Sequence, residues 1–298
     1  MHYDVIIIGG SYAGMAAALQ LVRARRPVLV IDAGERRNRF ASHSHGFLSH
    51  DGTDAGEIAL NARSQLQTYP ALTWLDGRAE AVTGQFDDFT VLTANGQTCQ
   101  GRRVLFATGV ADQLPPVPGI AERWGKTVFH CPYCHGYELG RGRIGVIATG
   151  PMSVHQAELL TEWGDVTLLA NGTIDIDAQA RQTLLARGVF IEEAGIARVH
   201  RDADVQLSDG RGLSFAGLFV ASRCEPASEL AAESGCALEE TPIGLQVRTD
   251  EAKQTTVPGI FACGDLARAP HSVSFAVADG VMAGIQLHRS LVWPDASA

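Results

Sequence analysis

The first 32 residues constrain the fold more than any other part of the chain. A β-branched run at residues 5–8 leads into the turn Gly9-Gly10-Ser11-Tyr12-Ala13-Gly14, an alanine-rich segment to about residue 25, and a second apolar run at residues 28–31. A strand, a glycine turn, a helix and a parallel strand within about thirty residues form the nucleotide-binding unit of doubly wound α/β folds. We therefore predict an opening parallel sheet that binds a nucleotide.

The glycine turn and the acid that follows it suit a dinucleotide. Gly9 and Gly14 tighten the bend from strand to helix, and the helix N-terminus attracts a pyrophosphate. Asp32, followed by Ala33, ends the second strand, where a carboxylate can accept hydrogen bonds from ribose hydroxyls. Ser11 replaces the middle glycine of G-x-G-x-x-G and adds a Cβ where the phosphate approaches. A glycine-rich turn without a ligand is the alternative interpretation.

A second unit of the same kind begins at residues 144–150. Its expected helix covers residues 153–163, and its next strand covers residues 165–169. Two such units imply two nucleotide-type domains. The proline-bearing stretches 114–119 and 239–244 are the expected crossings between them.

The remaining strands are expected to complete the first domain. Residues 89–93 and 97–100 flank Asn95-Gly96 as a hairpin, which leads into a strand at 103–106. Near the C-terminus another strand precedes a final helix at about residues 275–291. The two strands end in Ala107-Thr108-Gly109 and in Gly264-Asp265, respectively.

The composition excludes several classes of protein. With 298 residues and 46% hydrophobic content, the chain can bury one large or two medium cores, so disorder is not expected. The net charge is −9 and the basic residues are scattered, which argues against nucleic-acid and membrane-surface partners. The N-terminus enters a strand without room for a leader, and no apolar run reaches the roughly 18 residues of a membrane span. We expect a cytoplasmic protein.

The six cysteines include one close pair, Cys131 and Cys134. The other four are isolated, unlike the framework of a small secreted domain, so the pair is expected to be catalytic or metal-binding. Zinc needs four ligands and there is no second Cys-x-x-Cys, although histidines at 45 and 50, and at 130 and 135, have a ligand-like spacing. Two sulfurs at a helix start can close a disulfide, and a helix N-terminus favours the thiolate. Two nucleotide-type motifs in the same chain favour redox chemistry over zinc.

Together these motifs resemble the low-molecular-weight thioredoxin reductase family over nearly the whole chain. The matching features are, in order, the turn from Gly9 to Gly14 with Asp32, the strand end Ala107-Thr108-Gly109, the run Cys131-Pro132-Tyr133-Cys134-His135-Gly136-Tyr137-Glu138, and Gly264-Asp265. The form Cys-x-x-Cys-His-Gly, in place of Cys-x-x-Cys-Asp, is similar to that of fungal and bacterial dithiol oxidases that close disulfides in small natural products.

The resemblance implies a fold of two Rossmann-like, three-layer α/β nucleotide-binding domains, the second inserted in the first. Residues 1–112 and 242–298 would form the FAD-binding domain. Residues 113–241 would form an inserted NAD(P)-type domain that carries the disulfide. The resemblance also implies a homodimer.

The resemblance further assigns roles to residues. Cys134 would face the flavin, and Cys131 would exchange with substrate. His135 stands where reductases have an acid and is the expected proton-transfer residue, with His130 as the second candidate. Asp265 would bond the ribitol or phosphate end of FAD. The expected cofactor-binding residues are Gly9, Gly10, Ser11, Tyr12, Ala13, Gly14, Asp32, Ala33, Arg39, His45, Ala107, Thr108, Gly109, Gly264 and Asp265.

The loop at residues 39–52 would lie near the flavin ring. It contains His43, His45 and His50, but it has no cysteine. A polar loop is therefore expected there rather than a metal site.

The second turn departs from that of NADPH-using relatives, which carry Gly-x-Gly-x-x-Ala and a basic stretch after the next strand. Here residues 148–153 read Ala-Thr-Gly-Pro-Met-Ser, and no Lys or Arg occurs between Arg143 and Arg181. Two lost charge-assisted hydrogen bonds, at about 1.5–3 kcal/mol each, weaken NADPH binding roughly 10²- to 10⁴-fold. Asn171 stands in place of the carboxylate that would bind the ribose of NADH. We therefore expect inefficient nicotinamide binding.

The expected reaction is oxidation of a dithiol through Cys131 and Cys134 to FAD and on to oxygen, with release of hydrogen peroxide. The substrate would be a small molecule or a thioredoxin-like protein. One alternative is a thioredoxin-disulfide reductase fed by NADPH in an unusual mode, or by ferredoxin or reduced flavin. Another is a flavin-bound redox sensor without turnover.

Overall fold

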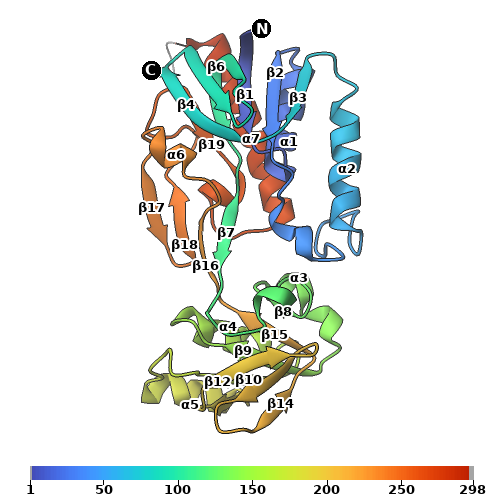
Figure 1. Cartoon of the computed structure of the whole chain (residues 1–298), viewed down its shortest axis with the longest axis vertical. Coiled ribbons are helices and arrows are strands. Elements are labelled where there is room, and N and C mark those ends of the chain that lie inside the picture. Colours follow the sequence, from blue (N-terminus) through green and yellow to red (C-terminus); the bar gives the residue numbers. More distant parts are fainter. Residues whose placement is uncertain (1, 295–298) are drawn as a thin grey trace. The chain divides into compact units, whose positions relative to one another are not determined.

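The computed structural model describes residues 2–294, and they divide into two compact units (Figure 1). The first unit comprises residues up to 37, 54–111, and 224 onward. The second comprises residues 38–53 and 112–223. No helix in the described part of the chain is long and apolar enough to cross a membrane.

The first unit is built on a seven-stranded sheet in the order β3-β2-β1-β6-β5-β4, with β19 also paired to β6. The predicted opening unit is present, because β1 and β2 are parallel and α1 connects them. β1 is buried almost throughout, as expected for a parallel strand that is covered on both faces. The strands are β1 (His2–Ile8), β2 (Val28–Asp32), β3 (Leu72–Asp76), β4 (Ala79–Gln85), β5 (Asp88–Thr93), β6 (Thr98–Phe106) and β19 (Ile260–Ala262).

β6 is one long strand where the sequence predicts a hairpin arm followed by a separate strand. Its first half pairs antiparallel with β5, and its second half pairs parallel with β19. The other edge of β6 pairs with β1 along the whole length of β1. A single strand therefore joins the antiparallel meander to the parallel sheet and carries the predicted strand end at Ala107.

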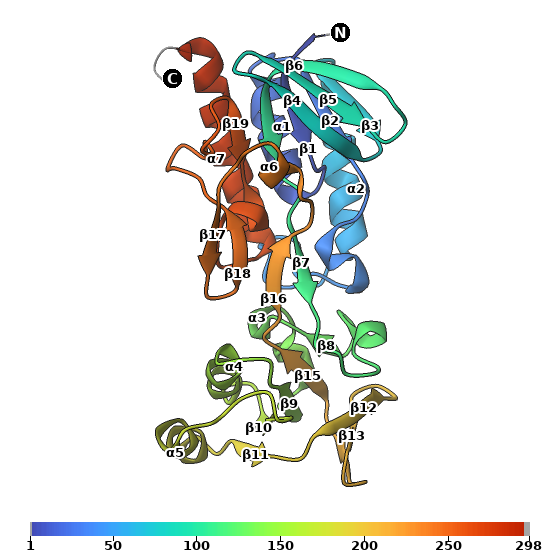
Figure 2. The same cartoon turned by 60° about the vertical axis from the view of Figure 1, so that its left-hand side comes forward.

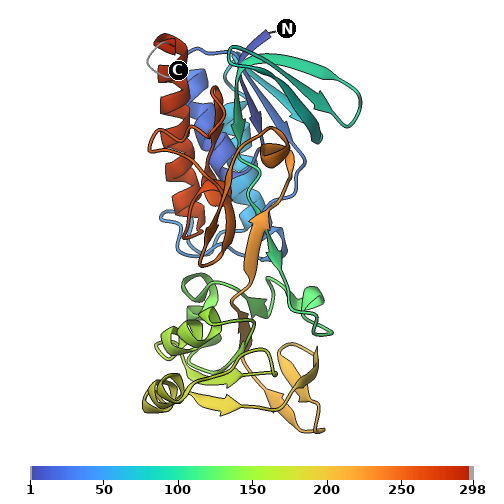
Figure 3. The ribbon, with the colours of Figure 1, turned by 90° about the vertical axis from the view of Figure 1, so that its left-hand side faces the viewer.

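The long C-terminal helix α7 (Val273–Val292) packs against α1 (Tyr12–Arg23) (Figure 3). A Cβ at Gly280 would lie 2.1 Å from the carbonyl oxygen of Ala13, and one at Gly284 would lie 2.7 Å from that of Ala17. Two glycines on α7 therefore allow the two helix backbones to approach closely. This contact places the middle of α7 beside the helix that follows the glycine turn. The first unit also contains α2 (Ala55–Leu66).

A four-stranded sheet in the order β17-β18-β16-β7 includes the two strands in which the chain passes between the units. The predicted crossing at 239–244 is wrong, because these residues form the antiparallel pair β17 and β18 with Pro242 in the turn. The chain accordingly passes between the units at 223/224 rather than at the expected 241/242, and residues 38–53 belong to the second unit. The elements are β7 (Val110–Gln113), β16 (Arg223–Pro226), α6 (Leu230–Glu233), β17 (Leu238–Thr241) and β18 (Gly244–Val247).

The second unit has a five-stranded parallel sheet in the order β11-β10-β9-β15-β8 (Figure 2). The predicted second βαβ start corresponds to β9, α4 and β10, and a three-stranded antiparallel sheet, β12-β13-β14, follows. The elements are β8 (Val128–Phe129), α3 (Pro132–His135), β9 (Arg143–Ile147), α4 (Met152–Leu160), β10 (Asp165–Leu169), α5 (Ala178–Ala186), β11 (Phe190–Glu192), β12 (Ile196–His200), β13 (Asp204–Leu207), β14 (Gly212–Ser214) and β15 (Gly217–Val220).

Candidate functional site

The first glycine turn is packed so closely that two of its positions accept only glycine. Gly9 has φ +108°, and a Cβ on it would lie 2.4 Å from the carbonyl oxygen of Ala107. A Cβ on Gly14 would lie 1.9 Å from the carbonyl oxygen of Gly9. Strand end, turn and helix start therefore meet without room for side chains, as a backbone that cradles a phosphate requires.

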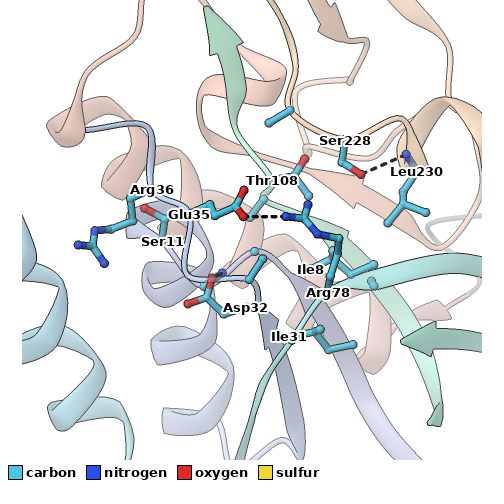
Figure 4. A pocket seen from close by; sticks show the side chains of 17 residues that line it. Ile8, Ser11, Ile31, Asp32, Glu35, Arg36, Arg78, Thr108, Ser228 and Leu230 are labelled. Atoms are coloured by element: carbon cyan, nitrogen blue, oxygen red, sulfur yellow. Dashed lines mark hydrogen bonds and ion pairs between the residues drawn. The ribbon is translucent and has the colours of Figure 1, made fainter. Parts of the chain in front are cut away.

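Ser11 begins α1 as its N-cap but makes no capping hydrogen bond with its side chain. It lines the pocket at the turn (Figure 4). Because its hydroxyl does not satisfy the helix, it can donate to or accept from a ligand. The departure from the glycine pattern therefore adds a hydrogen-bonding group to the helix N-terminus.

The Asp32 carboxylate is oriented by two backbone donors. Its Oδ1 accepts hydrogen bonds from the amides of Gly10 at 3.1 Å and Gly34 at 3.2 Å. Both hydrogen bonds described for this carboxylate use Oδ1. The glycine turn and the end of β2 thus hold the predicted ribose-binding group in one orientation.

The pocket at this turn spans about 600 Å³ of space between atoms, part of it open to solvent. Several lining residues were not predicted from the sequence. Among them Arg78, at the start of the meander, pairs with Glu35 at 2.9 Å (Figure 4). The pocket residues that the sequence did not indicate are Ile8, Ile31, Glu35, Arg36, Gly77, Arg78, Ala79, Ala227, Ser228 and Leu230.

The strand end after β6 supplies an unsatisfied hydroxyl to this pocket. Thr108 Oγ1 is buried and has no hydrogen-bond partner among the described residues. The next residue, Gly109, accepts a hydrogen bond from Ala227 at 3.0 Å, which ties the strand end to the segment that carries Ser228. The glycine cradle, the oriented Asp32 and the Thr108 hydroxyl together fit the dinucleotide part of FAD.

The Gly264-Asp265 turn lies outside this pocket lining and is anchored from α7. The amide of Gly264 donates to Asp279 Oδ2 at 2.9 Å, and Lys253 Nζ pairs with Asp279 Oδ1 at 2.6 Å. Asp279 is buried, and the ammonium group of Lys253 compensates its charge within the fold. Asp265 Oδ1 is buried without a hydrogen-bond partner in the described part of the chain, and this orphaned acceptor fits a ligand hydroxyl.

Cys131 and Cys134 lie at a one-turn helix in the second unit. Cys131 is the N-cap of α3, and the amide of Cys134 donates to the Cys131 carbonyl at 3.3 Å. Both cysteines are half-buried. Because α3 has only four residues, its dipole contributes less than the helix start predicted from the sequence. Tyr133 and Tyr137 are exposed on either side of Cys134.

His135 is held in an apolar contact. Its ring stacks on Phe129, with centroids 4.2 Å apart and planes at 14°. Both ring nitrogens are buried and have no hydrogen-bond partner among residues 2–294. Burial, with a smaller effect from the charge of His45, lowers the pKa of His135 to about 4. The imidazole is therefore neutral at neutral pH and keeps one donor and one acceptor for a reacting partner.

The predicted cofactor residues His45 and Arg39 belong to the second unit, with the cysteine pair. His45 Nδ1 lies 3.4 Å from Glu138 Oε1 and 3.6 Å from Asp51 Oδ1. Arg39 stacks over the ring of Phe40 at 4.3 Å. No pattern in the sequence indicates the contact between His45 and Glu138, which are distant along the chain.

The second histidine candidate is placed differently from His135. The ring of His130 lies against Trp124, with centroids 6.0 Å apart, and its backbone carbonyl accepts a hydrogen bond from Gln156.

The described residues contain no group of three or more His, Cys, Asp or Glu side chains that could hold a metal ion.

The chain is similar to known oxidoreductases over nearly its whole length. The family model described as pyridine nucleotide-disulphide oxidoreductase matches residues 3–280. The crystal structure of an oxidoreductase from Agrobacterium tumefaciens is 51% identical, with a TM-score of 0.96, and the match covers 99% of this chain and 100% of that one. The crystal structure of HlmI is 36% identical, with a TM-score of 0.91 and coverages of 99% and 94%.

Among curated proteins, thioredoxin reductase tcpT of Claviceps purpurea is 34% identical, over 97% of this chain and 95% of that protein. These matches confirm the resemblance and the fold class that the sequence predicts.

Proposed function

This chain belongs to the pyridine nucleotide-disulphide oxidoreductase family as a thioredoxin reductase-like, FAD-dependent oxidoreductase, and from this premise we propose that it oxidises a dithiol substrate to a disulfide. Electrons pass through Cys131 and Cys134, and oxygen is the final acceptor. The observation that carries the proposal concerns the second nucleotide-type turn, at residues 148–153. Its backbone amides and the Ser153 hydroxyl form hydrogen bonds within the protein itself.

The start of α4 has few amides to offer a pyrophosphate. Pro151 at the N-cap has no N–H. The amide of Ser153 donates to Gly150 at 3.0 Å, and that of Val154 donates to Pro151 at 3.1 Å. Ser153 Oγ accepts from the amide of Thr149 at 2.9 Å, which closes the turn further. A helix start normally leaves such donors for a phosphate, so this one favours a turn without nucleotide.

The residue after β10 that would bind a ribose also forms a hydrogen bond within the protein. Asn171 Oδ1 accepts from the amide of Ile196 at 2.7 Å, so it serves the fold of the second unit. Two arginines of the second unit are already paired with carboxylates, since Arg181 bonds Glu193 at 2.5 Å and Arg211 bonds Glu192 at 2.8 Å. Guanidinium groups that are already paired with carboxylates are poor partners for a 2′-phosphate.

The proposed reaction transfers two electrons in two successive steps. A substrate thiolate attacks Cys131 of the disulfide, and the second substrate thiol then displaces Cys131, which yields a substrate disulfide and the Cys131/Cys134 dithiol. FAD, when bound, supplies the oxidant that takes two electrons from this dithiol, and dioxygen takes them onward and leaves as hydrogen peroxide. Two protons accompany the electrons throughout.

His135 is the group of this chain that we assign to proton transfer at the sulfurs. Its neutral form accepts a thiol proton, and its low pKa returns that proton readily.

The direction of electron flow is testable by anaerobic titration of the purified holoenzyme. We expect stoichiometric NADPH or NADH to leave the flavin absorbance unchanged within minutes, and dithiothreitol to bleach it. Air should then restore the absorbance, with one hydrogen peroxide per flavin. Rapid bleaching by NADPH would show a reductase instead. Bleaching by dithiol without repeated turnover in air would show a sensor.

We also propose a cytoplasmic homodimer. Along α7, exposed apolar side chains recur on one face, at Phe275, Met282, Ile285 and Val292. An apolar helix face of this kind suits burial against a second copy. Sedimentation at the mass of two chains is expected for the holoenzyme, and a monomer at micromolar concentration would contradict this assembly.

A further inference from the structure

The segment that leads into the cysteine pair is held from α4. The side-chain amide of Gln156 donates from Nε2 to the backbone carbonyl of His130 at 2.8 Å. His130 directly precedes Cys131, the N-cap of α3, and α3 packs beside α4 within the second unit. A side chain of α4 therefore reaches the peptide group that joins His130 to Cys131.

Gln156 lies on the buried face of α4. The buried positions of this helix are Ser153, Gln156, Ala157 and Leu160, at the spacing of one helix face. Gln156 is 8% exposed, and its Oε1 is buried without a hydrogen-bond partner among the described residues. An apolar side chain of similar volume would fill this position without the cost of an unpaired oxygen. Packing alone therefore does not account for the amide, whereas its hydrogen bond to His130 does.

That hydrogen bond fixes the plane of the peptide group before Cys131. The peptide group is planar and trans, so the direction of the His130 carbonyl also sets the direction of the Cys131 amide and the place of the Cys131 Cα. The backbone of Cys131, with φ −108° and ψ 112°, then leads into α3. Two sulfurs close a disulfide only when their Cα and Cβ atoms lie within a narrow range of distances and directions. Gln156 thus acts on the geometry of the pair through the backbone of His130.

A second contact, from the segment after α4, holds the other side of α3. A Cβ on Gly136 would lie 2.7 Å from Trp163 Cδ1, so the backbone two residues after Cys134 lies directly against the indole. The ring of Tyr133 is nearly perpendicular to the same indole, with centroids 5.3 Å apart. Since a helix of four residues is not stable by itself, contacts on both of its sides determine where the two sulfurs lie.

We propose that Gln156 is a positioning residue for the redox pair, which holds the His130 carbonyl so that Cys131 and Cys134 are in place to close their disulfide. The proposal rests on the redox role proposed above for the two cysteines, and it is independent of the direction of electron flow. A glutamine with a purely structural role would affect the stability of the second unit and leave the disulfide equilibrium unchanged.

The first test observes the peptide group itself by NMR. His130-Cys131 is the single His-Cys pair of consecutive residues in the sequence, so carbonyl-¹³C-histidine together with ¹⁵N-cysteine labels one peptide group. In the holoenzyme, Gln156→Met should shift both resonances of this peptide group, because the carbonyl loses its donor. Gln182→Met replaces an exposed glutamine on α5 of the same unit and should leave both at their wild-type positions. Unchanged resonances in Gln156→Met would overturn the proposal.

The second test measures the disulfide equilibrium of the holoenzyme in anaerobic buffers of reduced and oxidised dithiothreitol. The pair forms its disulfide as oxidised dithiothreitol is reduced, and alkylation of the free thiols followed by mass spectrometry gives the fraction of each form. Gln156→Met should lower the equilibrium constant for disulfide formation about 10-fold, which corresponds to a reduction potential about 30 mV higher. Gln156→Asn keeps an amide but shortens its reach, and it should change the constant in the same direction. Gln182→Met should match wild type.

The melting temperature of each variant separates positioning from stability. A wild-type disulfide equilibrium in both Gln156 variants, even with a lower melting temperature, would contradict the proposal. Bleaching of the wild-type flavin by NADPH would overturn the proposed dithiol oxidation, yet the ratio of the equilibrium constants of variant and wild type would still decide the role of Gln156.

Discussion

Replacing Cys134 by serine should abolish bleaching of the flavin by dithiothreitol and leave FAD bound. A serine hydroxyl can neither form a disulfide nor pass two electrons, so the rate of flavin reduction should fall by about 10³-fold or more. FAD should remain because the residues that line the dinucleotide pocket belong to the first unit, whereas Cys134 belongs to the second. Stopped-flow absorbance under anaerobic conditions measures the rate, and the absorbance ratio of flavin to protein measures cofactor content.

Cys99→Ala is the matched control for the loss of a thiol. Cys99 is buried in β6 and belongs to the core of the first unit, so its removal should leave the rate of bleaching unchanged. Cys131→Ser should stop turnover as well, because the remaining thiol has no partner for an intramolecular disulfide. Flavin reduction at the wild-type rate in Cys134→Ser would show that the electrons take another route.

The sequence predicts the opening strand–turn–helix unit well because its constraints are local. Gly9 has a positive φ and Gly14 lies against the carbonyl of Gly9, so both positions are constrained within the strand–turn–helix unit itself, and such constraints leave a pattern in nearby residues. Asp32 is also predictable, since it ends the strand that follows the helix. The long helix at the C-terminus was also expected, and it differs from its predicted bounds by only a few residues.

The rest of the site depends on contacts between distant segments. Arg78 and Ser228 reach the pocket from the meander and from the segment after β16, and neither carries a local motif. Arg37 belongs to a basic run whose charge indicates nothing about its neighbours, yet it contacts Asp265 more than two hundred residues away. Pro242 looked like a linker residue, but it occupies a turn between two short strands. Composition does not distinguish these two roles.

His135→Asn should flatten the dependence of stability on pH. Burial holds the folded-state pKa at about 4, whereas the exposed imidazole of the unfolded chain titrates near 6.5. Between these values the unfolded chain binds a proton that the folded chain does not bind. The free energy of unfolding therefore falls as the pH is lowered from about 7 to 4, by roughly 3 kcal/mol from this residue. Urea unfolding at several fixed pH values measures the free energy of unfolding of the wild-type and the variant holoenzyme. In the difference between the two, the contributions of the other titratable groups cancel.

The same substitution tests proton transfer. If His135 accepts the thiol proton, His135→Asn should slow flavin reduction by dithiol about 10²- to 10⁴-fold at pH 7.5 with FAD content unchanged. His155→Asn, on the exposed side of α4, should behave as wild type. His130→Asn should have a smaller effect than His135→Asn, because the His130 ring packs against Trp124. A larger loss in His130→Asn than in His135→Asn would transfer the proton-transfer role to His130. A wild-type rate in both would mean that the thiols exchange protons with solvent directly.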